Sequence, residues 1–256
     1  MKFSVLGSNS SGNCIYIESE DTRVLIDAGL SHKRTKEMLA QIGVDICTIN
    51  ALCLTHEHSD HTAGLPVIYS KHNTPLFATG GTSVAVEENV KKSFGWNIFE
   101  PGMSFEIGSL NFETFSVSHD ASDPVGYVIS DGTSRIGIAT DMGVTPDMVV
   151  RHLRGCNTLI LEFNHDKTLL ENSTRPWSTK TRIAGNKGHL SNEQAYELLR
   201  NIADTDLRTV FLAHISDECN TPQIATRYAE EALSCCGLFG TARICVPTWP
   251  FPLLDV

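Results

Sequence analysis

The sequence predicts an α/β (or α+β) fold, and three observations support this prediction. Short apolar runs with strand composition recur along the chain. Turn residues or helical segments with capping signals separate these runs. Five of the runs end in a histidine or an aspartate, namely Asp27, His56, His119, Asp141 and His214. Because α/β proteins build their sites at the carboxyl ends of strands, we expect these side chains to share one site.

The composition is that of an ordinary soluble globular protein, with 41% hydrophobic and 20% charged residues. The 256 residues contain no obvious linker and no short-period repeat, so we expect one domain spanning residues 1–256. A net charge of −10 argues against a protein that binds nucleic acid over its whole surface, because such proteins are normally basic. An anionic partner must therefore be held by a local basic patch or by metal ions.

Nothing in the chain predicts export or a membrane. The opening residues 1–6 are too few, and Gly7 interrupts them too early, for a signal peptide. No apolar run approaches the ~20 residues needed to span a bilayer. The 8 cysteines are scattered without a C-x-x-C pair, which is typical of reduced thiols buried as small apolar side chains. We therefore expect a cytoplasmic protein without a membrane partner.

The first part of the chain is expected to alternate strands with helices. Strand composition covers residues 2–6, 14–18, 23–26, 51–54 and 75–78, and helical composition covers residues 31–42, 61–72 and 80–92. Ser31 is expected to cap the first helix, and Pro66 interrupts the second near its start. The segment from Gly7 to Asn13 is rich in turn residues and is expected to form a loop.

The middle of the chain is β-rich, and the last part alternates strands and helices again. Strands are expected at Phe99 and over residues 104–107, 110–117, 125–130, 135–140, 158–161, 209–213 and 243–246. Helices are expected over residues 145–153, 191–203 and 221–235. Residues 167–188 are polar, and we expect them to be irregular. In each half of the chain, a β-rich part is followed by alternating strands and helices. This shared order indicates two halves of similar structure.

One short stretch concentrates metal-binding side chains. Residues 55–61 read Thr-His-Glu-His-Ser-Asp-His and follow an apolar strand. In an extended segment His56 and His58 point the same way, whereas the adjacent Asp60 and His61 fit a turn better than a strand. Imidazole and carboxylate suit zinc, manganese or iron, and the lack of cysteine ligands argues against a closed structural zinc site.

The later histidines and the later aspartate enlarge this set beyond one metal ion. Five imidazoles and two carboxylates are too many for one catalytic zinc, which usually takes three protein ligands. They suit two divalent metal ions, zinc or manganese, that share a bridging carboxylate. The candidate ligands are His56, His58, Asp60, His61, His119, Asp141 and His214. Two such ions about 3.5–4 Å apart generate hydroxide at neutral pH and hold a phosphoryl or carbonyl oxygen, so we expect phosphodiester or ester hydrolysis.

The H-x-H-x-D-H stretch resembles the signature of the metallo-β-lactamase superfamily, and the later ligands follow in the matching order. This resemblance covers essentially the whole chain and implies a four-layer αββα sandwich with metal ions at one edge between the sheets. It implies that one metal ion is held by His56, His58 and His119. It implies that the second is held by Asp60, His61 and His214, with Asp141 bridging the two. It also implies that Asp27 supports the metal loop by hydrogen bonds.

Further segments resemble the YycJ/WalJ-like subgroup of that superfamily, whose members are regarded as DNA exonucleases acting from the 5′ end. These segments are the Gly/Ser-rich residues 7–14 and the later residues 162–166, 188–192 and 212–216. The resemblance implies 5′-to-3′ cleavage of DNA, in which a hydroxide bridging the metals attacks phosphorus. His165 or His189 would assist the leaving oxygen as a general acid, and Asp60 belongs to the same catalytic group.

Contacts with the nucleic acid are expected from two segments. In the first loop, backbone N–H groups and side chains would form a nest for an anion, through Ser8, Ser10, Ser11 and Asn13. The later segment, residues 167–188, carries more positive than negative charge in an acidic protein. Its candidate contacts are Arg175, Trp177, Lys180, Arg182 and Lys187. The basic side chains would meet phosphates, and the tryptophan would stack on a base.

Two other functions fit the same ligand set. One is hydrolysis of another substrate, by a small-molecule phosphodiesterase or a thioesterase of the glyoxalase II type. Hydrolysis of S-lactoylglutathione without DNA cleavage would identify the thioesterase. The other is a nucleic-acid-binding module with structural metals, in which His58→Ala would abolish folding rather than activity alone. An exported β-lactamase is disfavoured by the lack of a signal peptide, and a flavodiiron-type redox protein by the lack of a flavin domain.

Overall fold

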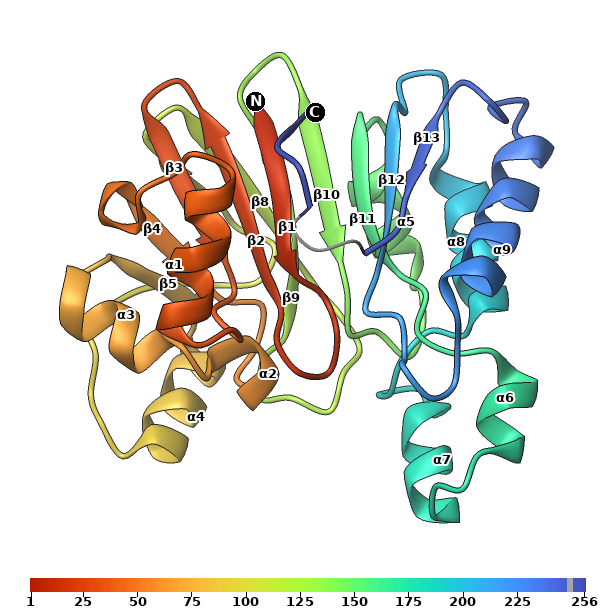
Figure 1. The fold of residues 1–256 in the computed structure, drawn as a ribbon, viewed down its shortest axis with the longest axis horizontal. Helices are drawn as coiled ribbons and strands as arrows, with labels where there is room; N and C mark the ends of the chain where they lie inside the picture. The colour runs from red at the N-terminus through yellow and green to blue at the C-terminus, as the bar shows by residue number, and fades with distance from the viewer. Residues whose placement is uncertain (248–250) are drawn as a thin grey trace.

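The computed structural model describes residues 1–247 and 251–256, and two stacked seven-stranded sheets form its centre (Figure 1). The first sheet contains β1 (Lys2–Gly7), β2 (Cys14–Ser19), β3 (Thr22–Ile26), β4 (Ala51–Cys53), β5 (Leu76–Thr79), β6 (Trp96–Phe99) and β14 (Leu254–Asp255). The second contains β7 (Ser104–Ile107), β8 (Leu110–Ser116), β9 (Val125–Ser130), β10 (Arg135–Ala139), β11 (Thr158–Glu162), β12 (Thr209–Ala213) and β13 (Arg243–Cys245). In each sheet the strands lie in sequence order, apart from β14, which pairs with β1.

Both sheets have the same internal layout. Each begins with antiparallel strands, β1 to β3 in the first sheet and β7 to β10 in the second. Each continues with parallel strands, β3 to β6 and β10 to β13. The parallel strands need crossover connections, and these bring in most of the helices. The repeated layout read from the sequence is therefore present in the structure.

Helices cover the outer face of each sheet, so the molecule has four layers (Figure 1). The first sheet is covered by α1 (His32–Gln41), α3 (Leu65–His72) and α4 (Gly80–Val90). The second is covered by α5 (Asp147–Leu153), α8 (Asn192–Ile202) and α9 (Pro222–Cys235). Three buried apolar clusters fill the three interfaces, one between the two sheets and one under each set of helices. The expected αββα sandwich is confirmed.

Helix α8 shows how the sequence specifies these elements. Ser191 caps its first turn, and Gln194 returns the hydrogen bond to the cap residue, which completes a capping box. The apolar residues that the helix buries are spaced by three or four positions, at Ala195, Leu198, Leu199 and Ile202. This stripe packs on the second sheet, and Ser191 at the helix start lies close to the strand ends.

The helix expected over residues 61–72 with an interruption at Pro66 is interrupted, but the break lies before Pro66. It is divided into α2 (Ser59–Thr62) and α3, with Gly64 between them. Gly64 donates its N–H to Ala28, and a Cβ at Gly64 would lie 2.0 Å from the Leu30 carbonyl oxygen. Pro66 then stands in the first turn of α3, where its missing N–H costs nothing. The close contact at Gly64 turns the chain, and Pro66 suits the start of the new helix.

Residues 167–188 were expected to be irregular, and this expectation is wrong. They contain α6 (Lys167–Asn172) and α7 (Trp177–Ile183), which extend from the body at the lower right of Figure 1. Asp166 caps α6 through its side chain, and Pro176 stands directly before α7. Two short elements, the 3₁₀ helix η1 (Ile46–Thr48) and β14, were not expected either. Among the described residues, no helix has the length and apolar character needed to cross a membrane.

Candidate metal centre

Three of the candidate site residues have a left-handed backbone conformation at the end of a strand. Asp27 follows β3 with a φ of 61°, Asp141 follows β10 with 58°, and His214 follows β12 with 52°. Residues other than glycine rarely adopt this conformation, and it costs on the order of 1 kcal/mol or more at each position. The conformation turns the chain sharply at the strand end, and all three side chains lie in the same buried cluster.

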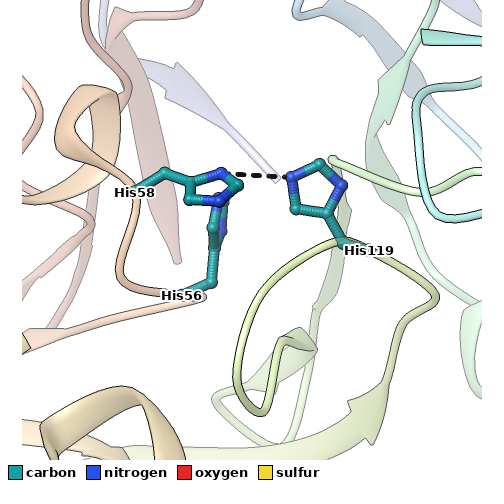
Figure 2. A group of neighbouring side chains, drawn as sticks. All are labelled: His56, His58 and His119. Carbon is teal, nitrogen blue, oxygen red and sulfur yellow. Dashed lines mark hydrogen bonds between the residues drawn. The ribbon is translucent and has the colours of Figure 1, made fainter. Parts of the chain in front are cut away.

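The first three ligand candidates form one group, called here the first half-site. His56 and His58 come from the loop after β4, and His119 comes from the loop after β8 (Figure 2). His58 Nδ1 and His119 Nε2 lie 3.3 Å apart. His119 donates its Nδ1–H to the Gly188 carbonyl at 3.1 Å, which leaves its Nε2 facing the other two histidines. These three residues offer nitrogen atoms that lie within 4.8 Å of one another.

Asp60, His61 and His214 form the second half-site. Asp60 Oδ2 lies 3.5 Å from His61 Nε2 and 3.7 Å from His214 Nε2. Asp60 and His61 belong to α2, whereas His214 follows β12 in the other sheet. The second half-site therefore joins the two sheets, as the first one does.

Asp141 lies between the two half-sites. Its Oδ2 is 3.5 Å from His61 Nε2, and its Oδ1 is 4.0 Å from His119 Nε2. The side chain is almost fully buried. Asp141 is thus the carboxylate within reach of both half-sites, which is the position that a bridging ligand requires.

The donor atoms of this cluster fit a metal ion better than they fit one another. Three buried polar atoms there have no hydrogen-bond partner among the described residues, namely His56 Nε2, Asp141 Oδ2 and His214 Nε2. Leaving a buried polar atom without a partner costs about 1–3 kcal/mol, so such atoms are rare unless something else binds them. Imidazole nitrogens and carboxylate oxygens are the ligands that zinc and manganese accept. The cluster is therefore suited to metal binding.

Asp27 supports residues 55–61, called here the metal loop, through hydrogen bonds. His61 donates its Nδ1–H to Asp27 Oδ2 at 2.8 Å. The backbone N–H and the hydroxyl of Thr55 donate to the same carboxylate at 2.8 and 2.9 Å. A histidine that donates one ring nitrogen to a carboxylate has its other nitrogen held in place for a metal ion.

Glu162 was missing from the predicted site, although it is fully buried within it. Its Oε1 accepts hydrogen bonds from His189 Nδ1 at 2.7 Å and His214 Nδ1 at 3.0 Å. Its Oε2 accepts from the backbone N–H groups of Met142 and Leu190. Glu162 ends the apolar strand β11, and a carboxylate at the end of a buried strand was the signal that could have identified it.

Electrostatics separates the ionised from the neutral groups of the metal-free cluster. Burial, together with nearby histidines, lowers the pKa of His56 well below its usual range, so this imidazole is neutral. Burial opposes charge on His61 too, but Asp27 and Asp141 outweigh it and raise the pKa of His61 to about 10. Burial is likewise outweighed at Asp141, whose pKa the charges of His214 and His61 lower well below its usual range. A metal ion must therefore displace a proton from His61 to bind there.

The two candidate general acids lie in different surroundings. His189 is hydrogen-bonded to Glu162, lies 3.7 Å from Asp141, and lines a cavity of about 190 Å³ beside His214. His165 is 1% exposed, does not line that cavity, and burial lowers its pKa to about 4. His189 can therefore meet a bound molecule, whereas His165 is enclosed by the protein.

The candidate residues of the first loop, between β1 and β2, lie in different places: some contact the metal-ligand candidates, and others lie toward the cavity or the surface. Ser8 Oγ accepts the backbone N–H of His214, and the Asn13 side chain donates to Asp60. Ser10 lines the cavity beside His189, whereas Ser11 is exposed and donates its backbone N–H to Asn9 Oδ1. The loop therefore reaches from the ligands to the open surface.

The candidate contacts in the basic segment, residues 167–188, also lie in different places. Arg175 and Arg182 line the cavity beside His189, and each has a carboxylate partner, Glu218 at 2.9 Å and Asp120 at 2.5 Å. The remaining three candidates do not line this cavity: Trp177 is 77% exposed, Lys187 is exposed, and Lys180 donates to the Glu171 carbonyl. Two of the five basic-segment candidates are thus placed beside the metal cluster.

Comparisons with known proteins agree with this architecture. Residues 22–215 match a family model described as a beta-lactamase superfamily domain. The chain is 33% identical to exodeoxyribonuclease YycJ of Bacillus anthracis, over 91% of this chain and 89% of that protein. It is 34% identical to exodeoxyribonuclease WalJ of Streptococcus pneumoniae, over 88% of this chain and 85% of that protein.

Solved structures show the same fold at low sequence identity. The metallo-beta-lactamase fold protein YhfI from Bacillus subtilis matches with a TM-score of 0.75 and 14% identity, over 100% of this chain and 99% of that one. Zn²⁺-bound PqqB from Methylobacterium extorquens matches with a TM-score of 0.68 and 18% identity, over 100% of both chains.

Proposed function

Since the chain belongs to the metallo-β-lactamase superfamily and is a hydrolase, we propose that it cuts phosphodiester bonds in DNA as a 5′-to-3′ exonuclease. The observation that carries this proposal is the cavity beside His189 and His214, which two arginines line at the edge of the metal cluster. Guanidinium groups are suited to phosphate, and they lie here in a protein whose net charge is −10. The names of the relatives, two exodeoxyribonucleases, point to the same substrate.

The proposed centre holds two divalent metal ions, zinc or manganese. The first half-site and the second half-site would each take one, and Asp141 would serve both. Bound there, such ions supply a hydroxide nucleophile at neutral pH and stabilise negative charge on the phosphoryl oxygens. The chain itself supplies the orientation: Asp27 holds His61, Glu162 holds His214, and the Gly188 carbonyl holds His119.

His189 is the proposed general acid. Its Nδ1–H is donated to Glu162, so Nε2 is the ring nitrogen left to serve the leaving oxygen. Burial opposes a charge on His189, but the Glu162 carboxylate outweighs it and raises the pKa of His189. A raised pKa favours the protonated ring, as an acid that protonates a leaving oxygen requires. His165 lacks this access and is assigned no part in the chemistry.

Arg175 and Arg182 are the proposed phosphate contacts. Each uses its Nε toward a carboxylate, and among the described residues neither has a hydrogen bond from its terminal NH₂ groups. Those groups are free for phosphate oxygens, in the paired geometry that guanidinium favours. Trp177, which begins α7, is the proposed platform for a base.

The test is a nuclease assay on the purified protein after its metal content is measured. Single- and double-stranded DNA, labelled at either end and with or without a 5′ phosphate, would be incubated with Mn²⁺ or Zn²⁺. We expect stepwise release of nucleotides from the 5′ end, and no release by Asp60→Ala. RNA of the same sequence and S-lactoylglutathione would run in parallel. Hydrolysis of either one without cleavage of DNA would overturn the proposed substrate.

A further inference from the structure

The loop between β1 and β2 contacts every member of the second half-site. Ser8 Oγ accepts the backbone N–H of His214 at 2.8 Å. The side-chain nitrogen of Asn13 lies 3.1 Å from Asp60 Oδ2 and 2.9 Å from His61 Nε2. In the first half-site Thr55 contacts His56 and the Gly188 carbonyl contacts His119, and among the described residues no hydrogen bond from the loop reaches these histidines. The loop is therefore a support for one half of the cluster.

Asn13 touches the ligand atoms themselves. Asp60 Oδ2 is the oxygen that faces His61 and His214, and His61 Nε2 is the nitrogen left free because Nδ1 is bonded to Asp27. The Asn13 side chain donates one N–H to Asp60 Oδ2, and this carboxylate oxygen keeps a second lone pair for a metal ion.

The backbone of Asn13 is fastened to the same place. Its N–H donates to the Asp60 carbonyl at 2.7 Å, and its own carbonyl accepts from Gly29 at 2.8 Å. The residue is 8% exposed, although the loop residues just before Gly12 lie near the surface. Because both its main chain and its side chain are held, Asn13 is fixed relative to Asp60.

Asp60 needs such a support more than the other two members of the second half-site do. Its side chain is 23% exposed, against 1% for His61 and 5% for His214. The four-residue helix that carries it, α2, is too short to hold a side chain by its own packing. Without Asn13, the Asp60 carboxylate would be free to turn toward solvent.

We propose that Asn13 is a positioning residue of the second half-site, where its amide aims the Asp60 carboxylate at the metal position that it shares with His61 and His214. Asn13 thereby sets the affinity of the second metal ion and leaves that of the first unchanged. The proposal rests on the two-metal centre proposed above but not on the nature of the substrate. Partners that orient metal ligands in this way typically contribute 10–100-fold in metal affinity.

The experiment is a Zn²⁺ titration of the metal-free protein, followed by calorimetry and by measurement of the bound metal after dialysis. Asn13→Ala would be compared with wild type and with Asn9→Ala, a matched change in the same loop. Within the part of the chain that the structure describes, Asn9 accepts only from backbone N–H groups of its own loop, so its replacement tests loop structure alone. We expect two ions on wild type and on Asn9→Ala. We expect Asn13→Ala to keep the affinity of one ion and to lose at least about tenfold in the other.

Three results would count against the proposal. Unchanged affinity for both ions in Asn13→Ala, tighter binding of the second ion, or equal weakening of both ions would each overturn it. If Asn13→Ala fails to fold, Asn13→Ser gives the same test, because its hydroxyl is too short to reach Asp60 Oδ2. A wild-type protein that binds fewer than two ions would instead refute the two-metal centre, so the two failures are distinguishable.

Discussion

At the scale of single residues, the chemistry of this protein depends on which nitrogen of each histidine is free. Asp27, Glu162, Thr55 and the Gly188 carbonyl each contact one ring nitrogen of a ligand histidine, which leaves the other nitrogen for a metal ion. The site is therefore specified as much by these partners as by the ligands.

The two candidate general acids can be separated by substitution with asparagine. His189→Asn should lower kcat by about 10²–10⁴-fold, because it removes the proposed proton donor, which lines the cavity. His165→Asn should leave kcat within a few-fold of wild type, since His165 is buried away from that cavity. Single-turnover cleavage of labelled DNA measures both. Equal losses in the two variants would show that the assignment of His189 is wrong.

Glu162→Gln should lower metal affinity or turnover by about 10–100-fold. The substituted amide has one oxygen and one NH₂ group, whereas all four partners of Glu162 are N–H donors. The NH₂ group of the glutamine would then lie against N–H donors and could not form a hydrogen bond with them. Metal titration and kcat on one preparation give the readout, and Glu113→Gln, at a surface pair with Arg135, is the control. Equal effects of the two substitutions would remove the proposed role of Glu162.

At the level of secondary-structure elements, the site depends on close contacts between backbone segments. Gly29, after β3, lies against the metal loop so closely that a Cβ would fall 1.6 Å from the Asp60 carbonyl oxygen. Gly29 also donates its N–H to Asn13. The first loop, the turn after β3 and α2 therefore form one packed unit.

Gly29→Ala should destabilise the protein by about 2–3 kcal/mol or more and weaken metal binding, because backbone atoms have to move apart. Gly80→Ala is the control, since a Cβ there would meet only the Ile98 side chain at 3.9 Å at the start of α4. Urea unfolding of the two variants and of wild type gives the comparison. If the Gly29→Ala protein had the stability of wild type, the contact between Gly29 and the metal loop would tolerate a side chain and the prediction would be wrong.

Helix α7 is the element expected to meet the substrate. Arg182→Gln should raise KM for DNA several-fold and reduce the slope of log K against log salt by about one, as loss of one phosphate contact requires. Arg200→Gln, on α8 and paired only with Glu197, should change neither quantity. Binding of catalytically inactive Asp60→Ala protein to labelled DNA at several salt concentrations measures the slope. An unchanged slope would exclude Arg182 from the interface.

At the scale of the whole molecule, the metal cluster joins the two sheets. Asp27 and the ligands of the metal loop follow strands of the first sheet, and His119, Asp141 and His214 follow strands of the second. A bound metal ion therefore links the two layers outside their common apolar core. Stability and metal content should then be coupled.

Removal of metal should lower Tm. An ion present at one hundred times its Kd stabilises the folded state by about 2.7 kcal/mol. For a chain of this size each kcal/mol corresponds to about 2–4 °C, so EDTA should lower Tm by about 5–10 °C. Calorimetry before and after chelation gives the shift, and re-addition of Zn²⁺ should restore it. A Tm that is independent of EDTA in metal-loaded protein would contradict the coupling.

The local features of this protein can be predicted from its amino-acid sequence. Apolar runs identified nearly every strand, capping residues and periodic stripes identified α8 and α9, and the spacing of residues 55–61 identified a metal loop. These features follow from backbone geometry within a few residues, which composition reveals. Helices α6 and α7 were not predicted because each is short and buries few apolar residues. Neither therefore shows the helical spacing of apolar residues in its sequence.

The contacts between side chains that are distant in the sequence could not be predicted and are known from the folded structure. Glu162 reads in the sequence as the end of a buried strand, and Asn13 reads as a turn residue. Their contacts with His189, His214 and Asp60 depend on the order of strands in two stacked sheets and on sharp left-handed turns at the strand ends. Hydrogen bonds form only within about 3 Å, and sequence periodicity carries no information about distances between separate strands at that precision.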